Sequence, residues 1–117
     1  MLLEDRISID APASRIFAFF DTMDRHYRDW HPDHIRFEWR QGTGVAPGNV
    51  SYFEETIAGK RMKKQVVFTL IESNRRIVFA PTNRLFRLVL PEMSFETEPA
   101  GHGSEFIARI VLRSASI

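Results

Sequence analysis

The 117-residue sequence has no cysteine, which excludes disulfide-stapled scaffolds, cysteine-ligated zinc and thiol nucleophiles. It also has no apolar run near the roughly 20 residues that span a bilayer. Sixteen Lys and Arg balance fifteen Asp and Glu, whereas nucleic-acid binders usually show a clear basic excess. The first residues include two acids and lack the basic start of a signal peptide. We therefore expect one cytoplasmic domain, residues 1–117, that binds no nucleic acid.

Motifs for phosphate binding and covalent catalysis are also missing. The sequence lacks the G-x-G-x-x-G dinucleotide-binding loop and the Walker phosphate-binding loop. It also lacks the H-E-x-x-H motif of zinc proteases and the G-x-S-x-G motif of serine hydrolases. We therefore predict no cofactor, and no nucleophile is evident. What the chain has in excess is aromatic residues, because ten Phe, two Trp and two Tyr make up 12% of it. In so small a domain, this many rings predict either a very dense core or a ring-lined cavity.

Hydrophobic periodicity predicts seven strands and two short helices. Ile16, Phe17 and Phe20 have helical spacing, whereas most other segments alternate with a period of two. The helices are expected at 12–20 and from 22 to 27 or 30, and the strands at 3–10, from 34, and at 50–57, 61–72, 76–79, 85–98 and 105–113. Pro91 predicts a bulge or kink in the sixth strand. The order predicts an α+β fold with a curved seven-stranded antiparallel sheet and both helices between the first two strands.

One hairpin register follows from turn chemistry. If Gly59 and Lys60 form a two-residue loop, Glu55 faces Lys64 and both lie on the apolar face. A carboxylate on such a face needs a partner, so we expect a cross-strand ion pair between Glu55 and Lys64. The pair lies either at the end of the sheet, in contact with water, or inside a pocket as its polar anchor.

Three of the four histidines, His26, His31 and His34, lie close together beside aspartates. Imidazole and carboxylate groups are ligands for zinc or iron, but His26 and His31 are five residues apart, which is about 140° around a helix. We therefore predict no metal site. Two interpretations stay open: an ordered connection with Trp30 packed under the sheet, or a pocket mouth lined by Trp30 and Tyr27. In the second, His31 or His34 forms hydrogen bonds or carries protons.

Residues 9–20, IDAPASRIFAFF, resemble the "I-x-A-P-x-x-x-V-F" opening of the START-like, or SRPBCC, superfamily. A Trp-His-Pro segment and antiparallel strands follow, as in the polyketide cyclase/dehydrase-like members, so the resemblance spans essentially the whole chain. It implies a helix-grip fold, in which the sheet wraps round a long C-terminal helix and leaves an apolar cavity. It also implies binding of lipids, sterols, polyketides or plant hormones, and in some members cyclisation or dehydration.

The C-terminal helix implied by the resemblance is absent or truncated in this sequence. Only residues 114–117 follow the last predicted strand, about one helical turn. A naturally short form, a truncation or a second subunit on the concave face would each account for this. An uncovered aromatic face exceeds the apolar patch that monomers usually expose, so we expect a homodimer.

We predict non-covalent binding of a small hydrophobic or aromatic ligand, lipid-like or polyketide-like, in a cavity on the concave face. The candidate wall residues are Phe20, Trp30, Phe37, Phe53, Phe68 and Phe95. The candidate polar anchors are Glu55, Lys64, His31 and His34. One alternative is a cyclase or dehydratase in which Glu55 or a histidine is the general acid or base. Another is a protein-interaction module, like the co-chaperones that share this fold.

Overall fold

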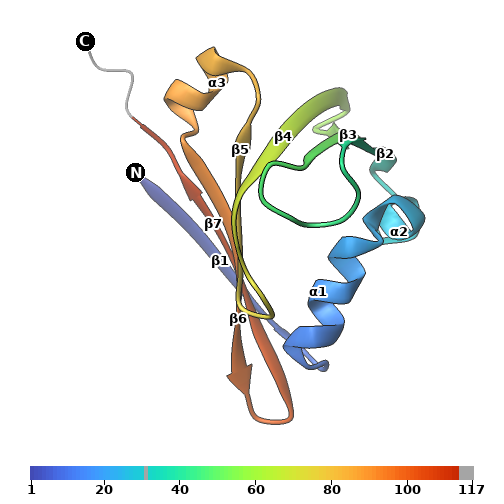
Figure 1. The fold of residues 1–117 in the computed structure, drawn as a ribbon, viewed down its shortest axis with the longest axis vertical. Coiled ribbons are helices and arrows are strands. Elements are labelled where there is room, and N and C mark those ends of the chain that lie inside the picture. The colour runs from blue at the N-terminus through green and yellow to red at the C-terminus, as the bar shows by residue number, and fades with distance from the viewer. Residues whose placement is uncertain (31, 114–117) are drawn as a thin grey trace.

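A computed structural model describes residues 1–30 and 32–113 (Figure 1). The elements are β1 (Leu2–Ile9), α1 (Ala13–Asp21), α2 (Met23–Trp30), β2 (His34–Gln41), β3 (Val50–Ile57), β4 (Lys60–Glu72), β5 (Arg76–Pro81), α3 (Arg84–Val89), β6 (Glu92–Ala100) and β7 (Gly103–Val111). The predicted α+β class is confirmed, with two helices between the first two strands. The third helix is an addition to the prediction.

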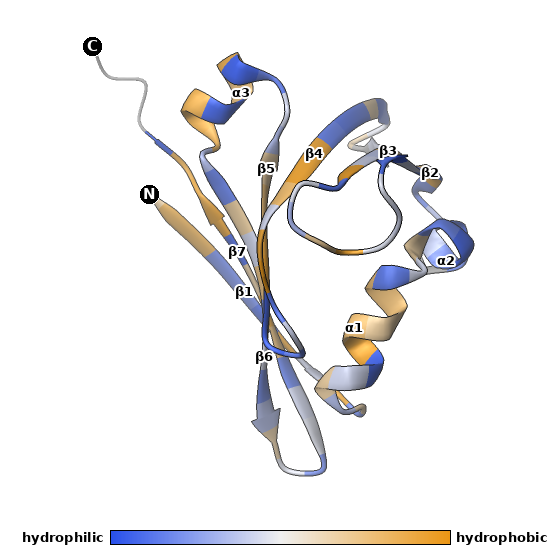
Figure 2. Ribbon diagram, in the orientation of Figure 1, coloured by the Kyte–Doolittle hydropathy of each residue, from blue (hydrophilic) through white to orange (hydrophobic). Residues whose placement is uncertain are grey.

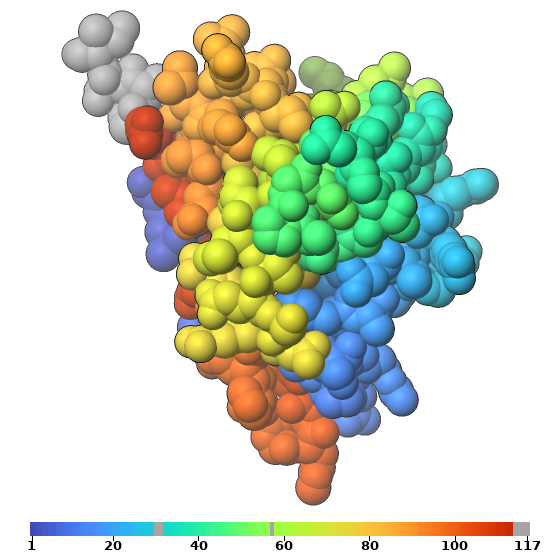
Figure 3. Space-filling view, in the orientation of Figure 1, coloured from blue at the N-terminus to red at the C-terminus, as the bar shows by residue number. Residues whose placement is uncertain are grey.

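All seven strands form one antiparallel sheet in the order β1-β7-β6-β5-β4-β3-β2. Helices α1 and α2 lie along the same face of this curved sheet, which we call the concave face (Figure 1). Helix α3 and the β6–β7 turn lie at opposite ends of the molecule (Figure 3). Among the described residues, no helix combines the length and hydrophobicity needed to cross a bilayer.

Helix α1 is anchored to the sheet by an apolar stripe. It is more hydrophobic than α2 (Figure 2), and its buried residues are Ile16 and Phe20. The Phe20 ring stacks on Phe95 and Phe106, with ring centroids 5.3 and 6.0 Å apart. At the end of the helix, the Asp21 carboxylate accepts a hydrogen bond of 2.8 Å from the backbone N–H of Val45. This bond holds the loop between β2 and β3 against α1.

The prediction of a strand over residues 85–98 is wrong at its N-terminal end, because α3 occupies that part. The side-chain oxygen of Asn83 accepts hydrogen bonds from the N–H groups of Leu85 and Phe86, at 2.9 and 3.2 Å, and so caps the helix. Pro91 lies in the junction between α3 and β6, not within a kinked strand. The apolar side chains of α3 are exposed: Leu85, Phe86, Leu88 and Val89.

The predicted β3–β4 register is wrong by two residues. The loop consists of Ala58 and Gly59, not Gly59 and Lys60, and both loop residues have positive φ, 52° and 79°, as a type I′ turn requires. Glu55 consequently faces Met62. Because side chains alternate with a period of two, a two-residue shift leaves each of them on its predicted face.

The opposite, convex face of the sheet carries a network of ion pairs around one fully buried residue. Ile107, which is 0% exposed, faces Arg6 on β1 and Glu96 on β6, with Glu105 and Arg109 on the same side of β7. Arg109 contacts Glu96 at 2.6 Å, and Arg6 contacts Glu105 at 3.1 Å. The aliphatic parts of the long side chains can shield Ile107 while their charged ends pair in water.

Candidate functional site

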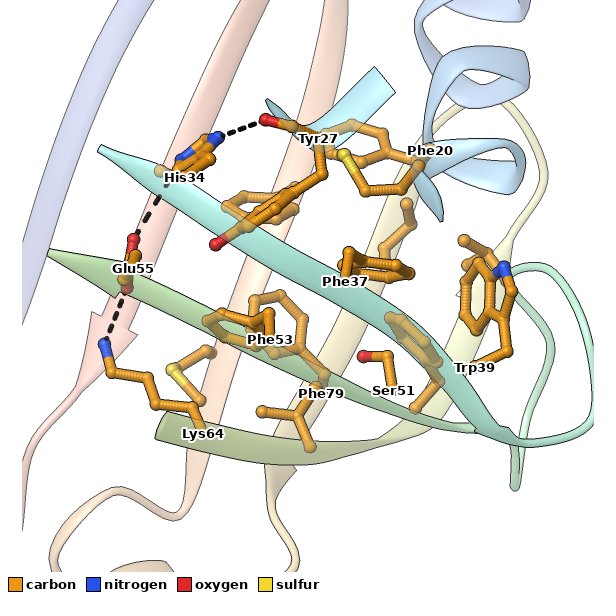
Figure 4. Close-up of a pocket in the computed structure, with 18 of the residues that line it drawn as sticks. Phe20, Tyr27, His34, Phe37, Trp39, Ser51, Phe53, Glu55, Lys64 and Phe79 are labelled. Carbon is orange, nitrogen blue, oxygen red and sulfur yellow. Dashed lines mark hydrogen bonds and ion pairs between the residues drawn. The ribbon is translucent and has the colours of Figure 1, made fainter. Parts of the chain in front are cut away.

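A cavity of about 310 Å³ lies between the concave face and helices α1 and α2 (Figure 4). Its lining residues come from both helices, from β2 to β7 and from the β2–β3 loop. This volume is at the lower end of the roughly 300–1,000 Å³ typical of small-molecule sites. The site is therefore a hollow in the core of the fold that suits a compact ligand.

Aromatic rings form a continuous wall along this cavity. The rings are contributed by Phe20, Tyr27, Phe37, Trp39, Phe53, Phe68, Phe79 and Phe95. From Phe20 the contacts run through Phe95, Phe79, Phe68 and Trp39 to Phe37, with successive centroids 5.0 to 6.1 Å apart. Such ring pairs pack in tilted, edge-on and offset geometries that hold each ring in place. The wall is thus preorganised for apolar and aromatic surfaces.

Three polar side chains meet at one end of the cavity (Figure 4). Lys64 Nζ donates a hydrogen bond of 3.1 Å to Glu55 Oε1, which gives the ion pair predicted from the sequence. The pair is diagonal across the two strands, because of the corrected register. His34 Nε2 lies 4.0 Å from the other carboxylate oxygen, Oε2 of Glu55. Most of the Glu55 and His34 side-chain surface is shielded from water, with 21% and 15% exposed.

A β-bulge brings His34 to this end of the cavity. The sequence alternation predicts that Ile35 shares a face with Phe37, which would direct His34 to the other face. In the structure, His34 pairs with Glu55 and Arg36 with Glu54, so Ile35 is the extra residue between them. Bulges often redirect side chains next to functional sites. The prediction for Ile35 is wrong, and His34 lines the cavity instead.

Tyr27 of α2 lies against the same polar end. Its ring stacks on the imidazole of His34, with centroids 4.0 Å apart and planes within 6°. His34 Nδ1 donates a 2.9 Å hydrogen bond to the Tyr27 carbonyl oxygen, so Nε2 is left to face Glu55. Burial, and secondarily the negative charge of Glu55, raise the pKa of the Tyr27 hydroxyl well above its ordinary value. The hydroxyl therefore keeps its proton.

Eight of the ten residues predicted to bind a ligand line this cavity: Phe20, His34, Phe37, Phe53, Glu55, Lys64, Phe68 and Phe95. The side chain of Trp30 and the whole of His31 lie outside the described residues. These eight residues come from one predicted helix and four predicted strands, and the structure brings them together around one cavity. Contact with a ligand stays a prediction for all ten.

The lining residues outside the ten predicted site residues include Met23, Tyr27, Trp39 and Phe79. Trp39 is predictable as a lining residue, because it lies two residues after Phe37 in the same strand and therefore faces the same side of the sheet. Phe79 lies in a short strand that is almost wholly apolar, so the sequence does not show which of its side chains face the cavity. One of the two interpretations of the histidine segment expects Tyr27 at a pocket mouth, whereas Met23 lies in a polar-rich helix whose apolar pattern is too weak to predict its buried face.

Metal ligands are not clustered in residues 1–30 and 32–113: no group of three or more His, Asp or Glu side chains there could hold an ion. His34 and Glu55 approach each other, and Tyr27 and Lys64, which also contact them, add no histidine or carboxylate ligand. This end of the cavity therefore offers a ligand hydrogen-bonding and charged groups.

Comparison with solved structures shows the fold. A major latex-like protein 151 from Panax ginseng superposes with a TM-score of 0.81 at 16% identity, covering 99% of this chain and 80% of its own. The Aha1 dimer from Colwellia psychrerythraea gives 0.68 at 17% identity, covering 100% and 80%. The di-domain ARO/CYC BexL of the BE-7585A biosynthetic pathway gives 0.69 at 19% identity, covering 98% and 37%.

Comparison at the level of sequence gives one family. No curated protein matches the chain. The family model described as Activator of Hsp90 ATPase homolog 1-like protein matches residues 10–110, which is most of the chain. Together with the structural neighbours, this match confirms the predicted resemblance to the START-like superfamily. The chain therefore belongs to the Activator of Hsp90 ATPase homolog 1-like family.

Proposed function

We propose that this protein binds a small, apolar, ring-containing ligand non-covalently in the concave cavity. The observation that carries the proposal is the continuous aromatic wall, which has polar side chains gathered at one end. Mostly apolar walls with a few placed polar groups are typical of sites that both hold and orient a small molecule. A volume of about 310 Å³ favours a compact molecule with a few rings over a lipid with two long chains.

Saturable binding of a neutral, environment-sensitive dye such as N-phenyl-1-naphthylamine tests this proposal. Ala108 lines the cavity and is half-buried, so an Ala108→Phe substitution should fill the hollow and weaken dye binding at least tenfold. The matched control is Ala18→Phe, which adds the same ring at an exposed position of α1 and should leave the affinity unchanged. No saturable binding to the unmodified protein, or equal binding by both variants, would refute the proposal.

Acid–base catalysis in the same cavity is the second candidate function. The supporting observation is the approach of His34 Nε2 to Glu55 Oε2, 4.0 Å, within a largely apolar surrounding. A histidine beside a carboxylate can take up and release protons near neutral pH. Incubation with a linear polyketide mimic, followed by mass spectrometry, distinguishes the two functions, because dehydration removes one water and simple binding leaves the mass unchanged.

We further propose that a second copy of the chain covers the outer part of the concave face. Leu3 and Ile7 face Ile110 and Phe106 across the β1–β7 pair, so these side chains share one face of the sheet. Leu3, Ile7 and Ile110 are nevertheless exposed. The Colwellia psychrerythraea neighbour is an Aha1 dimer, which supports the idea. Light scattering coupled to size-exclusion chromatography should give the mass of two chains, and a monomer would contradict the proposal.

A further inference from the structure

The cavity contains a buried hydroxyl group that has no hydrogen-bond partner among the described residues. Tyr27 is 6% exposed, and none of the described residues accepts a hydrogen bond from its hydroxyl. Buried hydroxyl groups are nearly always hydrogen-bonded, because an unpaired one has lost its contacts with water without replacement. An orphan donor of this kind, in a wall otherwise made of rings, points to a ligand atom that accepts its hydrogen.

The Tyr27 ring is held in place from several sides. It stacks on His34 at 4.0 Å and approaches Phe37 and Phe53 at 5.5 and 6.1 Å between centroids. Figure 4 shows the ring between His34 and Phe53, with its hydroxyl oxygen among the cavity side chains. Because these contacts come from both β2 and β3, the ring cannot turn its hydroxyl to water without breaking the packing. The donor is therefore fixed in direction before a ligand arrives.

The surroundings of the hydroxyl limit which acceptor it can meet. The Glu55 carboxylate is close enough for its negative charge to act on Tyr27, and Glu55 already accepts a hydrogen bond from Lys64. A second anion at this place would be repelled by Glu55. A neutral oxygen, such as that of a ketone, a quinone or an ether, meets no such penalty, and the rings beside it suit an aromatic framework.

We propose that Tyr27 orients the ligand by donating a hydrogen bond, and that the ligand is a compact, uncharged aromatic molecule with a carbonyl or ether oxygen. This inference rests on the proposed ligand-binding function. It adds which polar group the ligand carries and which residue, Tyr27, forms a hydrogen bond with that group. The negative charge of Glu55 then disfavours ligands that carry a carboxylate near this hydroxyl.

A pair of probes that differ only at the oxygen tests this assignment. Fluorene and 9-fluorenone share one ring framework, and the ketone replaces a methylene group. Isothermal titration calorimetry on the unmodified protein should show fluorenone binding about tenfold more tightly, equivalent to about 1.4 kcal/mol. Fluorene-9-carboxylate should bind more weakly than both.

The variant Tyr27→Phe keeps the ring and removes only the hydroxyl. It should bind fluorene as the unmodified protein does and lose the tenfold preference for fluorenone. Tyr52→Phe is the matched control, because the Tyr52 hydroxyl lies outside the cavity and donates to Glu54 at 2.9 Å. This control should keep the preference.

The outcomes separate the inference from the function on which it rests. An unchanged preference in Tyr27→Phe, or equal binding of both probes by the unmodified protein, overturns the role of Tyr27 and leaves ligand binding intact. If the unmodified protein binds neither probe while it does bind the naphthylamine dye, the ligand class is wrong and the cavity function stands. If nothing binds, both proposals fail.

Discussion

Replacing Phe20 with alanine should cost this protein about 3 kcal/mol of unfolding free energy. Phe20 is one of the two buried residues of α1, so its ring is a main attachment of that helix to the sheet. Core Phe→Ala substitutions cost about 3–5 kcal/mol. Phe20 loses its contacts with Phe95 and Phe106, but one side of the ring already borders the cavity, so the lower end of the range applies.

The assay is equilibrium unfolding in urea. Small domains have m-values of about 1–3 kcal/mol per molar urea, so with a value near 2 the midpoint should fall by about 1.5 M. The control is Phe86→Ala, the same substitution at a side chain that is 64% exposed on α3, where the change should stay within about 0.5 kcal/mol. If both variants shift the midpoint equally, the Phe20 ring does not anchor α1 as described.

Three further predictions concern other parts of the fold. Ile107→Ala should lower the unfolding free energy by about 2–5 kcal/mol, because the side chain is fully buried under the convex ion pairs; a loss below 1 kcal/mol in urea would show that this burial contributes little. Ala58→Asn should raise the stability by roughly 0.5–1 kcal/mol, since asparagine tolerates the left-handed φ of 52° better than alanine, and an unchanged urea midpoint would count against a type I′ turn. The raised pKa of Tyr27 means that its contribution to stability is complete below about pH 10, where an unfolded tyrosine is still protonated, and is lost as the pH rises further. Alkaline unfolding curves of Tyr27→Phe should show a smaller loss than those of the unmodified protein, and parallel losses would contradict this assignment.

The sheet and the position of most wall residues could be predicted because strand alternation is a robust signal. Alternation places Phe53 and Phe68 on the correct face even though the predicted hairpin register is wrong by two residues. The error lies in the loop: turn chemistry predicts glycine at its first position, whereas the structure has Ala58 there with a positive φ. Positive φ is uncommon for alanine, so turn chemistry alone could not predict it.

Helix α3 and the polar end of the cavity could not be predicted from the alternation of apolar and polar residues. The run from Leu85 to Val89 is apolar enough to suggest a strand, and the capping side chain of Asn83 was the one local sign of a helix start. His34 reaches the cavity through a bulge at Ile35, which depends on how β2 pairs with β3. Tyr27 is buried by packing between α2 and two strands, which is a property of the assembled fold.

The neighbouring positions of β1 and β7 impose an order on folding. Among the described strands, β1 comes first in the chain and pairs with β7, which comes last of the seven, so this pairing cannot form until residues 103–111 have been synthesised. The backbone N–H of Leu112, for example, bonds to the carbonyl of Met1 across almost the whole chain. Contacts of such sequence separation form slowly because a long loop must close first. Until then the charged residues Glu4, Asp5 and Arg6 interrupt the apolar side chains of β1 and discourage its pairing with other unfolded chains. β7 thus completes the pairing of β1, and Glu4 and Arg6, which form ion pairs on the convex face of the folded sheet, also make the unpaired strand less prone to aggregate.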